Sequence, residues 1–148
     1  MIITYTDANG IEERYSTDDL SAKEAAAVED ALDGTPWRAI EDRLRGQSPT
    51  AMCAVLWAFR RRGEPGLVFG EFDVPGWKRR LKVRIERAEI DDVLGSLVAE
   101  ALANSEDAAI DAMLPHLRKL AEDQADVDAA LDALGKGHLV AGREDSAA

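Results

Sequence analysis

The pattern of hydrophobic and polar residues begins as a strand pattern and changes to helical spacing after residue 16. In "IITYTDANGIEERYS", β-branched and aromatic residues flank Asn9-Gly10, which predicts a β-hairpin over residues 2–16. "SAKEAAAVEDALDG" then predicts a helix over residues 21–33, because good helix formers follow either of two capping residues, Thr17 or Ser21.

Two further helices follow, each opened by a capping residue and a proline. "TPWRAIEDRLRG" predicts a helix over residues 36–45, with Thr35 as its cap and Pro36 in its first turn. The same start recurs in "SPT" and predicts a helix over residues 49–62. Since its residues from Ala51 to Phe59 are all apolar, we expect it to be the central helix, covered by its neighbours.

After the arginines at the end of this run, the hydrophobic period changes to two. The spacing predicts strands over residues 67–74 and 77–87, joined loosely through Pro75-Gly76. The first carries an acidic face and the second a basic one, so we expect the two to pair.

Helical spacing returns near residue 89. It predicts a helix over 89–103 and a C-terminal helical region over 104–136, with Ser105 as a cap and Pro115 as a kink or break. The polar end, residues 137–148, is expected to be disordered. The fold class is therefore mainly α with minor β (α+β). It comprises an N-terminal hairpin, a central three-helix unit, a short pair of β segments and C-terminal helices, with a core domain over residues 1–103.

Composition narrows the function. The 148 residues carry a net charge of -11, which makes nucleic-acid binding unlikely, because such binding relies on Lys and Arg to neutralise phosphates. Residues 60–87 nevertheless form a basic band, which fits either a solvated face or self-association or docking on a charged partner. Within it, Trp77–Arg87 is the one nucleic-acid candidate, although a half-buried strand explains the same alternation.

Few residues suggest catalysis or metal binding. Cys53 lies in an apolar run and is expected to be a core residue, and neither His116 nor His138 has a partner at metal-ligand spacing. No phosphate loop or nucleophile motif is present, and paired acids at helix starts suit capping. We therefore expect no enzyme activity, no cofactor and no metal. We also expect no membrane span and no secretory signal, and hence an intracellular protein.

One stretch, from Leu20 to Phe72, resembles a known family. It contains, in order, "AKEAAAVE" with Glu29, then "DGTPWRAIEDRL", a short "GQSPTA" loop, "AVLWAFRRR" with Trp57, and Pro65 followed by "LVFGEFD". This order and spacing resemble the tail assembly chaperones of long-tailed, siphovirus-like bacteriophages, especially those that infect actinobacteria. The resemblance covers about a third of the chain, and the extended basic strand after "FGEFD" departs from the all-helical members.

The resemblance implies a non-enzymatic protein that binds the tape measure protein, keeps it soluble and promotes polymerisation of the tail tube protein around it. Such chaperones act in the host cytoplasm and are absent from the finished virion. The family commonly has a longer second product made by ribosomal frameshifting, and Gly135-Lys136 is the dipeptide that a slippery heptamer would encode. Partners are therefore the tape measure protein, the tail tube protein and the frameshifted form.

A long helical partner with an apolar face calls for an amphipathic groove. We expect the edges of the three-helix unit to provide it, through the aromatic residues Trp37, Trp57 and Phe59 with Arg60, Arg61 and Arg62 at the rim. If the aromatic residues are buried, the C-terminal helices are the next candidate. The alternative functions are a structural virion component, such as a minor tail or head-completion protein, or a nucleic-acid-binding accessory protein.

Overall fold

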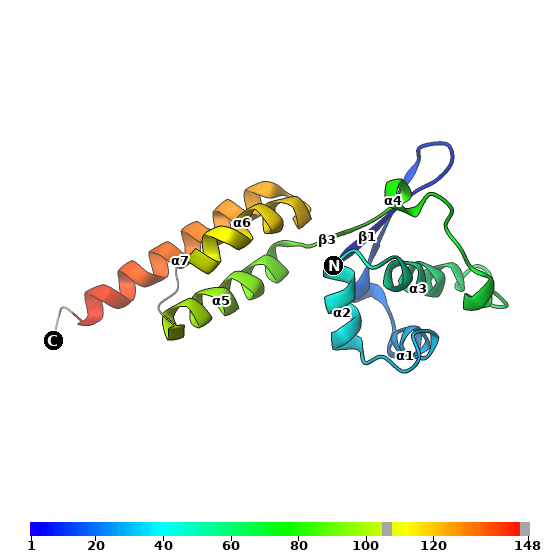
Figure 1. The fold of residues 1–148 in the computed structure, drawn as a ribbon, viewed down its shortest axis with the longest axis horizontal. Helices are drawn as coiled ribbons and strands as arrows, with labels where there is room; N and C mark the ends of the chain where they lie inside the picture. The colour runs from blue at the N-terminus through cyan, green and yellow to red at the C-terminus, as the bar shows by residue number, and fades with distance from the viewer. Residues whose placement is uncertain (105–107, 146–148) are drawn as a thin grey trace. The chain divides into compact units, whose positions relative to one another are not determined.

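The structure is a computed structural model that describes residues 1–104 and 108–145, with residues 136–145 described by their backbone (Figure 1). Its fold is mainly α with minor β, as the sequence predicts, and the strands described form a three-stranded antiparallel sheet. The chain divides into two compact units, Met1–Arg84 and Ile85–Ala148, which are described separately below.

The predicted hairpin is confirmed. Strands β1 (Ile2–Thr6) and β2 (Glu12–Ser16) pair antiparallel, with Ile2 opposite Ser16 and Thr6 opposite Glu12. The loop between them is held by the Asp7 carboxylate, which accepts hydrogen bonds from the backbone N–H groups of Asn9 and Ile11 at 2.8 and 2.9 Å. Gly10 has a φ of 81°, a left-handed conformation that glycine adopts without strain.

The predicted pairing of two strands over 67–74 and 77–87 is wrong. Residues 67–74 contain a 3-10 turn, η2 (Phe69–Glu71), and the second segment opens as a short helix, α4 (Trp77–Arg80). Within these two segments only β3 (Leu81–Arg84) forms a strand, and it pairs antiparallel with β1, giving the sheet order β2-β1-β3. Gly76, with a φ of 71°, turns the chain into α4. The backbone N–H and C=O groups on the free edge of β1 then form the hydrogen bonds that β3 needs.

Three helices complete the first unit: α1 (Ala22–Ala31), α2 (Trp37–Arg45) and α3 (Pro49–Arg60). Ser21 caps α1 through a capping box with Glu24, one of the two caps expected. The central position of α3 is also confirmed, because its side chains from Ala51 to Phe59 are buried except for the half-buried Cys53. It contacts α1, α2, β1 and β3.

The expected cap of α2 is wrong. Pro36, not Thr35, occupies the capping position and offers no side-chain acceptor. The Glu29 carboxylate of α1 accepts a hydrogen bond from the Trp37 backbone N–H at 2.7 Å, while the Thr35 hydroxyl donates to the Leu32 carbonyl. An acid from the preceding helix therefore satisfies the first free amide of α2.

The second unit consists of α5 (Arg87–Asn104), α6 (Ala108–Leu120) and α7 (Gln124–Asp145). Helix α5, which we expected in a core domain ending at residue 103, packs against α6 and α7. Ahead of it, Ile85 forms a parallel bridge with Ala121. The buried side chains here include Ile90, Leu94, Leu117 and Val127.

Two expectations for the C-terminal region need correction, and a third is untested. Pro115 does not break α6, which continues to Leu120. The tail over 137–148, expected to be disordered, is helical as far as Asp145, because it holds no proline and its leucine, alanine and arginine favour α7. Ser105, the expected cap, lies outside the described residues, as do residues 146–148.

Candidate functional site

The aromatic residues expected to form the groove are mainly core residues. Trp57 and Phe59 are each only 7% exposed, and Trp37 is half-buried. The Trp57 indole N–H donates to the Leu67 carbonyl at 3.0 Å, and its ring lies 5.5 Å from that of Phe69. Trp57 therefore holds the turn after α3 against the helix and offers little surface to a partner.

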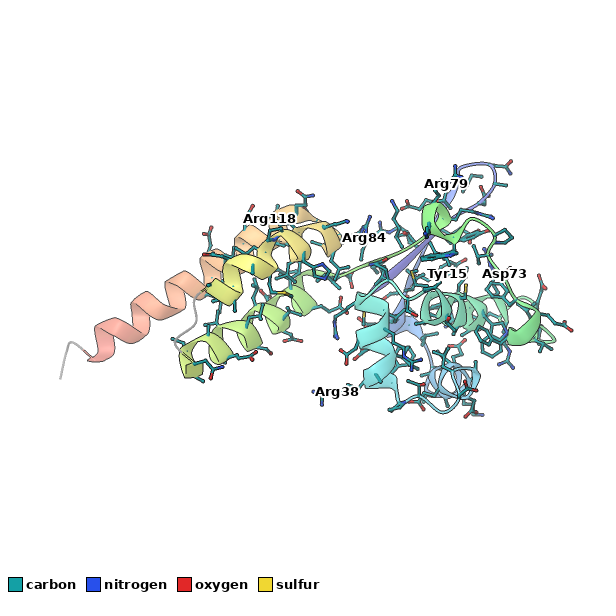
Figure 2. The ribbon with its side chains drawn as sticks, in the orientation of Figure 1. Tyr15, Arg38, Asp73, Arg79, Arg84 and Arg118 are labelled. Atoms are coloured by element: carbon teal, nitrogen blue, oxygen red, sulfur yellow. The ribbon has the colours of Figure 1, made fainter. Side chains whose placement is uncertain are left out.

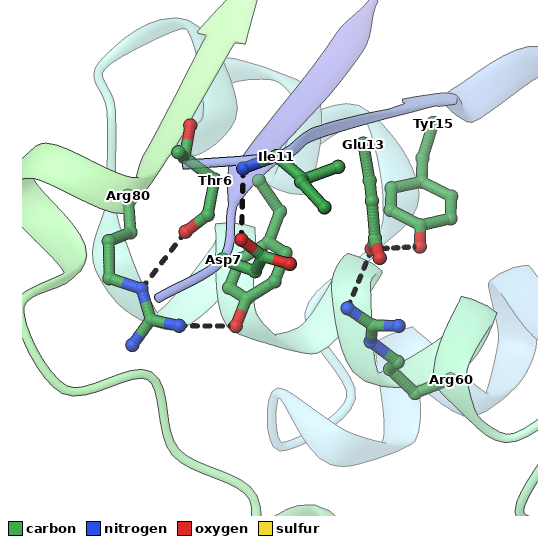
Figure 3. Close-up of polar contacts among 8 residues, drawn as sticks. Thr6, Asp7, Ile11, Glu13, Tyr15, Arg60 and Arg80 are labelled. Atoms are coloured by element: carbon green, nitrogen blue, oxygen red, sulfur yellow. Dashed lines mark hydrogen bonds and ion pairs between the residues drawn. The ribbon is translucent and has the colours of Figure 1, made fainter. Parts of the chain in front are cut away.

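Arg60 belongs to a network that joins α3 to the sheet (Figure 3). Its guanidinium lies over the Tyr5 ring, 5.1 Å from the centroid, and donates to the Glu13 carboxylate at 2.7 Å. The Tyr15 hydroxyl donates to the same carboxylate at 2.6 Å, and burial is the main cause of the raised pKa of Tyr15. Arg60 is thus engaged within the fold.

Arg80 completes this network from α4. Its guanidinium donates to the Thr6 carbonyl at 3.0 Å and to the Tyr5 hydroxyl, and it lies over the Tyr5 ring. Figure 3 shows Arg80 and Arg60 approaching the hairpin from different elements. The pair stabilises the sheet, because each cation meets an aromatic face and a hydrogen-bond acceptor.

Arg62 is engaged as well, on the side facing α1. It donates two hydrogen bonds to the Glu24 carboxylate, at 2.7 and 2.9 Å, and one to the Asp19 carbonyl at 2.8 Å. The hydrogen bond from Arg62 is the main reason that the pKa of Glu24 falls to about 2. Glu24 therefore stays ionised, and its negative charge is matched by Arg62.

Arg61 differs from its two neighbours. Its guanidinium stacks on the Trp57 ring at 4.8 Å, and within the described part of the chain it has no acidic partner. It lines a surface pocket of about 240 Å³ formed between α1, the end of α3 and the turn that follows. The lining residues are Lys23, Glu24, Ala27, Ala58, Arg61, Arg62 and Pro65.

The pocket carries positive charge that its own acid does not balance. Glu24 is matched by Arg62, whereas neither Lys23 nor Arg61 forms an ion pair with any described residue. Sequence reasoning missed Lys23, although its i, i+4 spacing from Ala27 places both on one face of α1. The other lining residues, Ala27, Ala58 and Pro65, are small and apolar, so the lining combines apolar side chains with basic ones.

Other candidate sites receive less support. Trp77–Arg87 does not form a continuous basic strand, because its first residues are helical and Arg80 is engaged with the hairpin; the exposed Arg79 is labelled on α4 in Figure 2. Burial raises the pKa of the Cys53 thiol, which disfavours the reactive thiolate.

The described residues contain neither a metal-binding cluster nor a membrane-spanning helix. In residues 1–104 and 108–145, no cluster of three or more His, Cys, Asp or Glu is placed to hold a metal ion. No helix there is both long and apolar enough to cross a bilayer.

Fold and pocket together define a mainly helical α+β protein with a small basic surface pocket. No family model, no curated protein and no solved structure matches the chain.

Proposed function

We propose that the protein is a non-enzymatic tail assembly chaperone of a long-tailed bacteriophage. In this role it binds the tape measure protein, keeps it soluble in the host cytoplasm and promotes assembly of the tail tube around it. The tail tube protein and a longer frameshifted form of the chain are further partners in the proposal.

The observation that carries the proposal is the way in which the resembling segments are joined. Glu29, in the first segment, accepts the hydrogen bond from the backbone N–H of Trp37 in the second. Trp57, in "AVLWAFRRR", donates to the carbonyl of Leu67, in "LVFGEFD". Residues quoted for the resemblance thus join neighbouring segments within one unit, as expected if their order and spacing specify a common fold.

The nature of the surface is compatible with this role. Binding a long helical partner requires surface area with mixed apolar and charged character, not a deep catalytic cavity. The pocket at the end of α3 has this character, with three small apolar residues beside two unmatched cations. Arg61 and Arg62, two of the residues expected at the rim, line this pocket, and its apolar lining comes from alanines and a proline, not from the aromatic residues.

The gene neighbourhood tests the proposal at the level of DNA. We expect a very long reading frame with helical periodicity immediately downstream, joined to this one by an overlapping second frame. The codons for Gly135-Lys136 should form a slippery heptamer, G-GGA-AAG or G-GGA-AAA. A glycine codon other than GGA would remove the frameshift part of the proposal, and a neighbourhood without a long helical frame would argue against the whole.

Co-expression tests the activity directly. The product of the long downstream frame should be insoluble when expressed alone and soluble when expressed with this protein. Mass spectrometry of purified particles separates the chaperone from a structural virion component, because a chaperone is absent from the finished particle. Detection of the chain at stoichiometric amounts in particles would refute the proposed function in favour of a tail or head-completion protein.

A further inference from the structure

We infer that the pocket between α1 and the end of α3 binds an acidic amphipathic segment of the tape measure protein, an inference that rests on the proposed function. In the bound state, one apolar side chain of the segment contacts the apolar lining residues Ala27, Ala58 and Pro65. A neighbouring carboxylate of the segment contacts Arg61 and Lys23.

The size of the pocket favours a single side chain as its occupant. Sites for cofactors and other small molecules commonly have volumes of about 300–1,000 Å³, and this pocket has about 240 Å³. Two alanines and a proline supply the apolar part of its lining, and their small side chains leave space. An apolar side chain that enters it would be released from water, which favours binding.

Charge determines what must accompany that side chain. The three arginines at the end of α3 differ in whether they have an acidic partner. Arg60 forms an ion pair with Glu13 and Arg62 with Glu24, at 2.7 Å in both pairs. Arg61 and Lys23 have no acidic partner among the described residues. A carboxylate placed between them would gain charge-assisted hydrogen bonds without displacing an existing ion pair.

The pocket is also preorganised. Trp57 fixes Arg61 from below by stacking at 4.8 Å, and its indole N–H holds the turn that carries Pro65 by donating to Leu67. The Arg62–Glu24 pair links the two helices that form the walls. Because these contacts exist before binding, little conformational entropy is lost when a segment enters.

The whole chain has a net charge of -11, so the unmatched positive charges of Arg61 and Lys23 are a local exception. An acidic segment is repelled by most of the surface, so unmatched cations determine where it docks. The basic rim thus selects the register of the segment as well as its charge.

The test reverses one charge in the pocket and one outside it. Lys23→Glu changes the second residue of α1, and the control Arg38→Glu changes the second residue of α2 (Figure 2), so the two variants alter net charge and helix position identically. Both positions are exposed, and an acid there suits the helix dipole, so neither variant should unfold. Arg61→Glu is the third variant.

Each variant carries an affinity tag and is co-expressed with the full-length tape measure protein. The amount of tape measure protein that is retained with the tagged variant is measured. Overlapping synthetic peptides of the tape measure protein are measured by fluorescence polarisation. We expect Lys23→Glu and Arg61→Glu to weaken the best peptide by about tenfold, as expected for loss of a charge-assisted hydrogen bond, while Arg38→Glu binds like the wild type. Replacing the carboxylates of that peptide by amides should weaken it similarly, and added salt should weaken it further.

The outcomes separate the two proposals. If the wild type retains no tape measure protein, the proposed function fails. If it does retain the protein, but both pocket variants bind as well as Arg38→Glu, the pocket inference alone is overturned. A best peptide without acidic residues would overturn the inference in the same way. Restored binding of Arg61→Glu by a peptide with lysine in place of its acid would support direct contact.

Discussion

Replacing Gln47 should destabilise the first unit more than its position in a surface loop suggests. Its side-chain amide forms two hydrogen bonds with the backbone of Val83, donating to the carbonyl at 3.0 Å and accepting from the N–H at 2.9 Å. Val83 is fully buried in β3 and pairs with Ile3 of β1 on its other side. Gln47 thus takes the place of a neighbouring strand at this point of the sheet.

The size of the effect follows from these two bonds. Each contributes about 1 kcal/mol net, and a buried partner left unsatisfied costs about 1–3 kcal/mol, so Gln47→Ala should lower the free energy of unfolding by about 2–3 kcal/mol. Gln47→Glu keeps the acceptor but sets a carboxylate oxygen against the Val83 carbonyl oxygen, so at neutral pH it should cost at least as much as Gln47→Ala. The backbone φ of 58° strains any residue with a Cβ, so Gln47→Gly should be about 1 kcal/mol more stable than Gln47→Ala.

Tryptophan fluorescence during urea denaturation is a suitable assay. Trp37, Trp57 and Trp77 all belong to the first unit, so the signal reports its unfolding and not that of α5–α7. The order of stability should be wild type, Gly and Ala, with Glu no more stable than Ala. A value for Gln47→Ala within about 0.5 kcal/mol of the wild type, typical of an ordinary surface change, would refute the strand-mimicking role.

Three further predictions concern side chains around α1 and α3. Glu29→Ala removes the acceptor for the first amide of α2 and should cost about 1 kcal/mol in the same urea assay, whereas Glu29→Gln should cost less. Trp57→Phe loses the hydrogen bond to Leu67, so limited proteolysis should cleave residues 64–76 faster, and an unchanged rate would contradict this. The pKa of Glu24 is about 2, below its ordinary value, so its bond to Arg62 stabilises the fold above pH 4.5 and is lost as pH falls towards 2. When the pH is lowered from 5 to 3, the free energy of unfolding of Glu24→Gln should therefore fall less than that of the wild type.

Features controlled by neighbouring residues could be predicted from the sequence. Ser21 caps α1 through Glu24, three residues on, and Ser48 caps α3 ahead of a proline. The unbroken apolar run from Ala51 to Phe59 is central because no polar face is available to meet water. In each case the decisive contact lies within about one helical turn.

Features that depend on distant partners could not be predicted. The period-two spacing of Leu81, Val83 and Ile85 does correspond to burial, since all three are buried. It does not say which strand β3 will pair with, and the partner is β1, nearly the whole first unit away in sequence. The same limit explains the cap of α2, because Glu29 belongs to the preceding helix.

The candidate site was partly accessible from the sequence. The arginine cluster and its aromatic neighbours were identified, but the aromatic side chains point into the fold. Helical spacing predicts which arginine stacks on which ring better than composition does. Trp57 and Arg61 are four residues apart, and Phe59 and Arg62 are three apart, and side chains meet on a helix at these separations. The acids that neutralise two of the arginines come from β2 and α1, and their proximity required the fold.

The three consecutive arginines differ in role because of what lies opposite each of them. Arg60 meets Glu13 and Arg62 meets Glu24, so removing either affects the contacts of α3 with the sheet or with α1. Arg61 meets no acid among the described residues, so its charge remains available to a partner. Replacing all three at once would therefore combine a folding defect with a binding defect. Only single substitutions can separate the two, and we expect binding to weaken without unfolding when the charge at Arg61 or Lys23 is reversed.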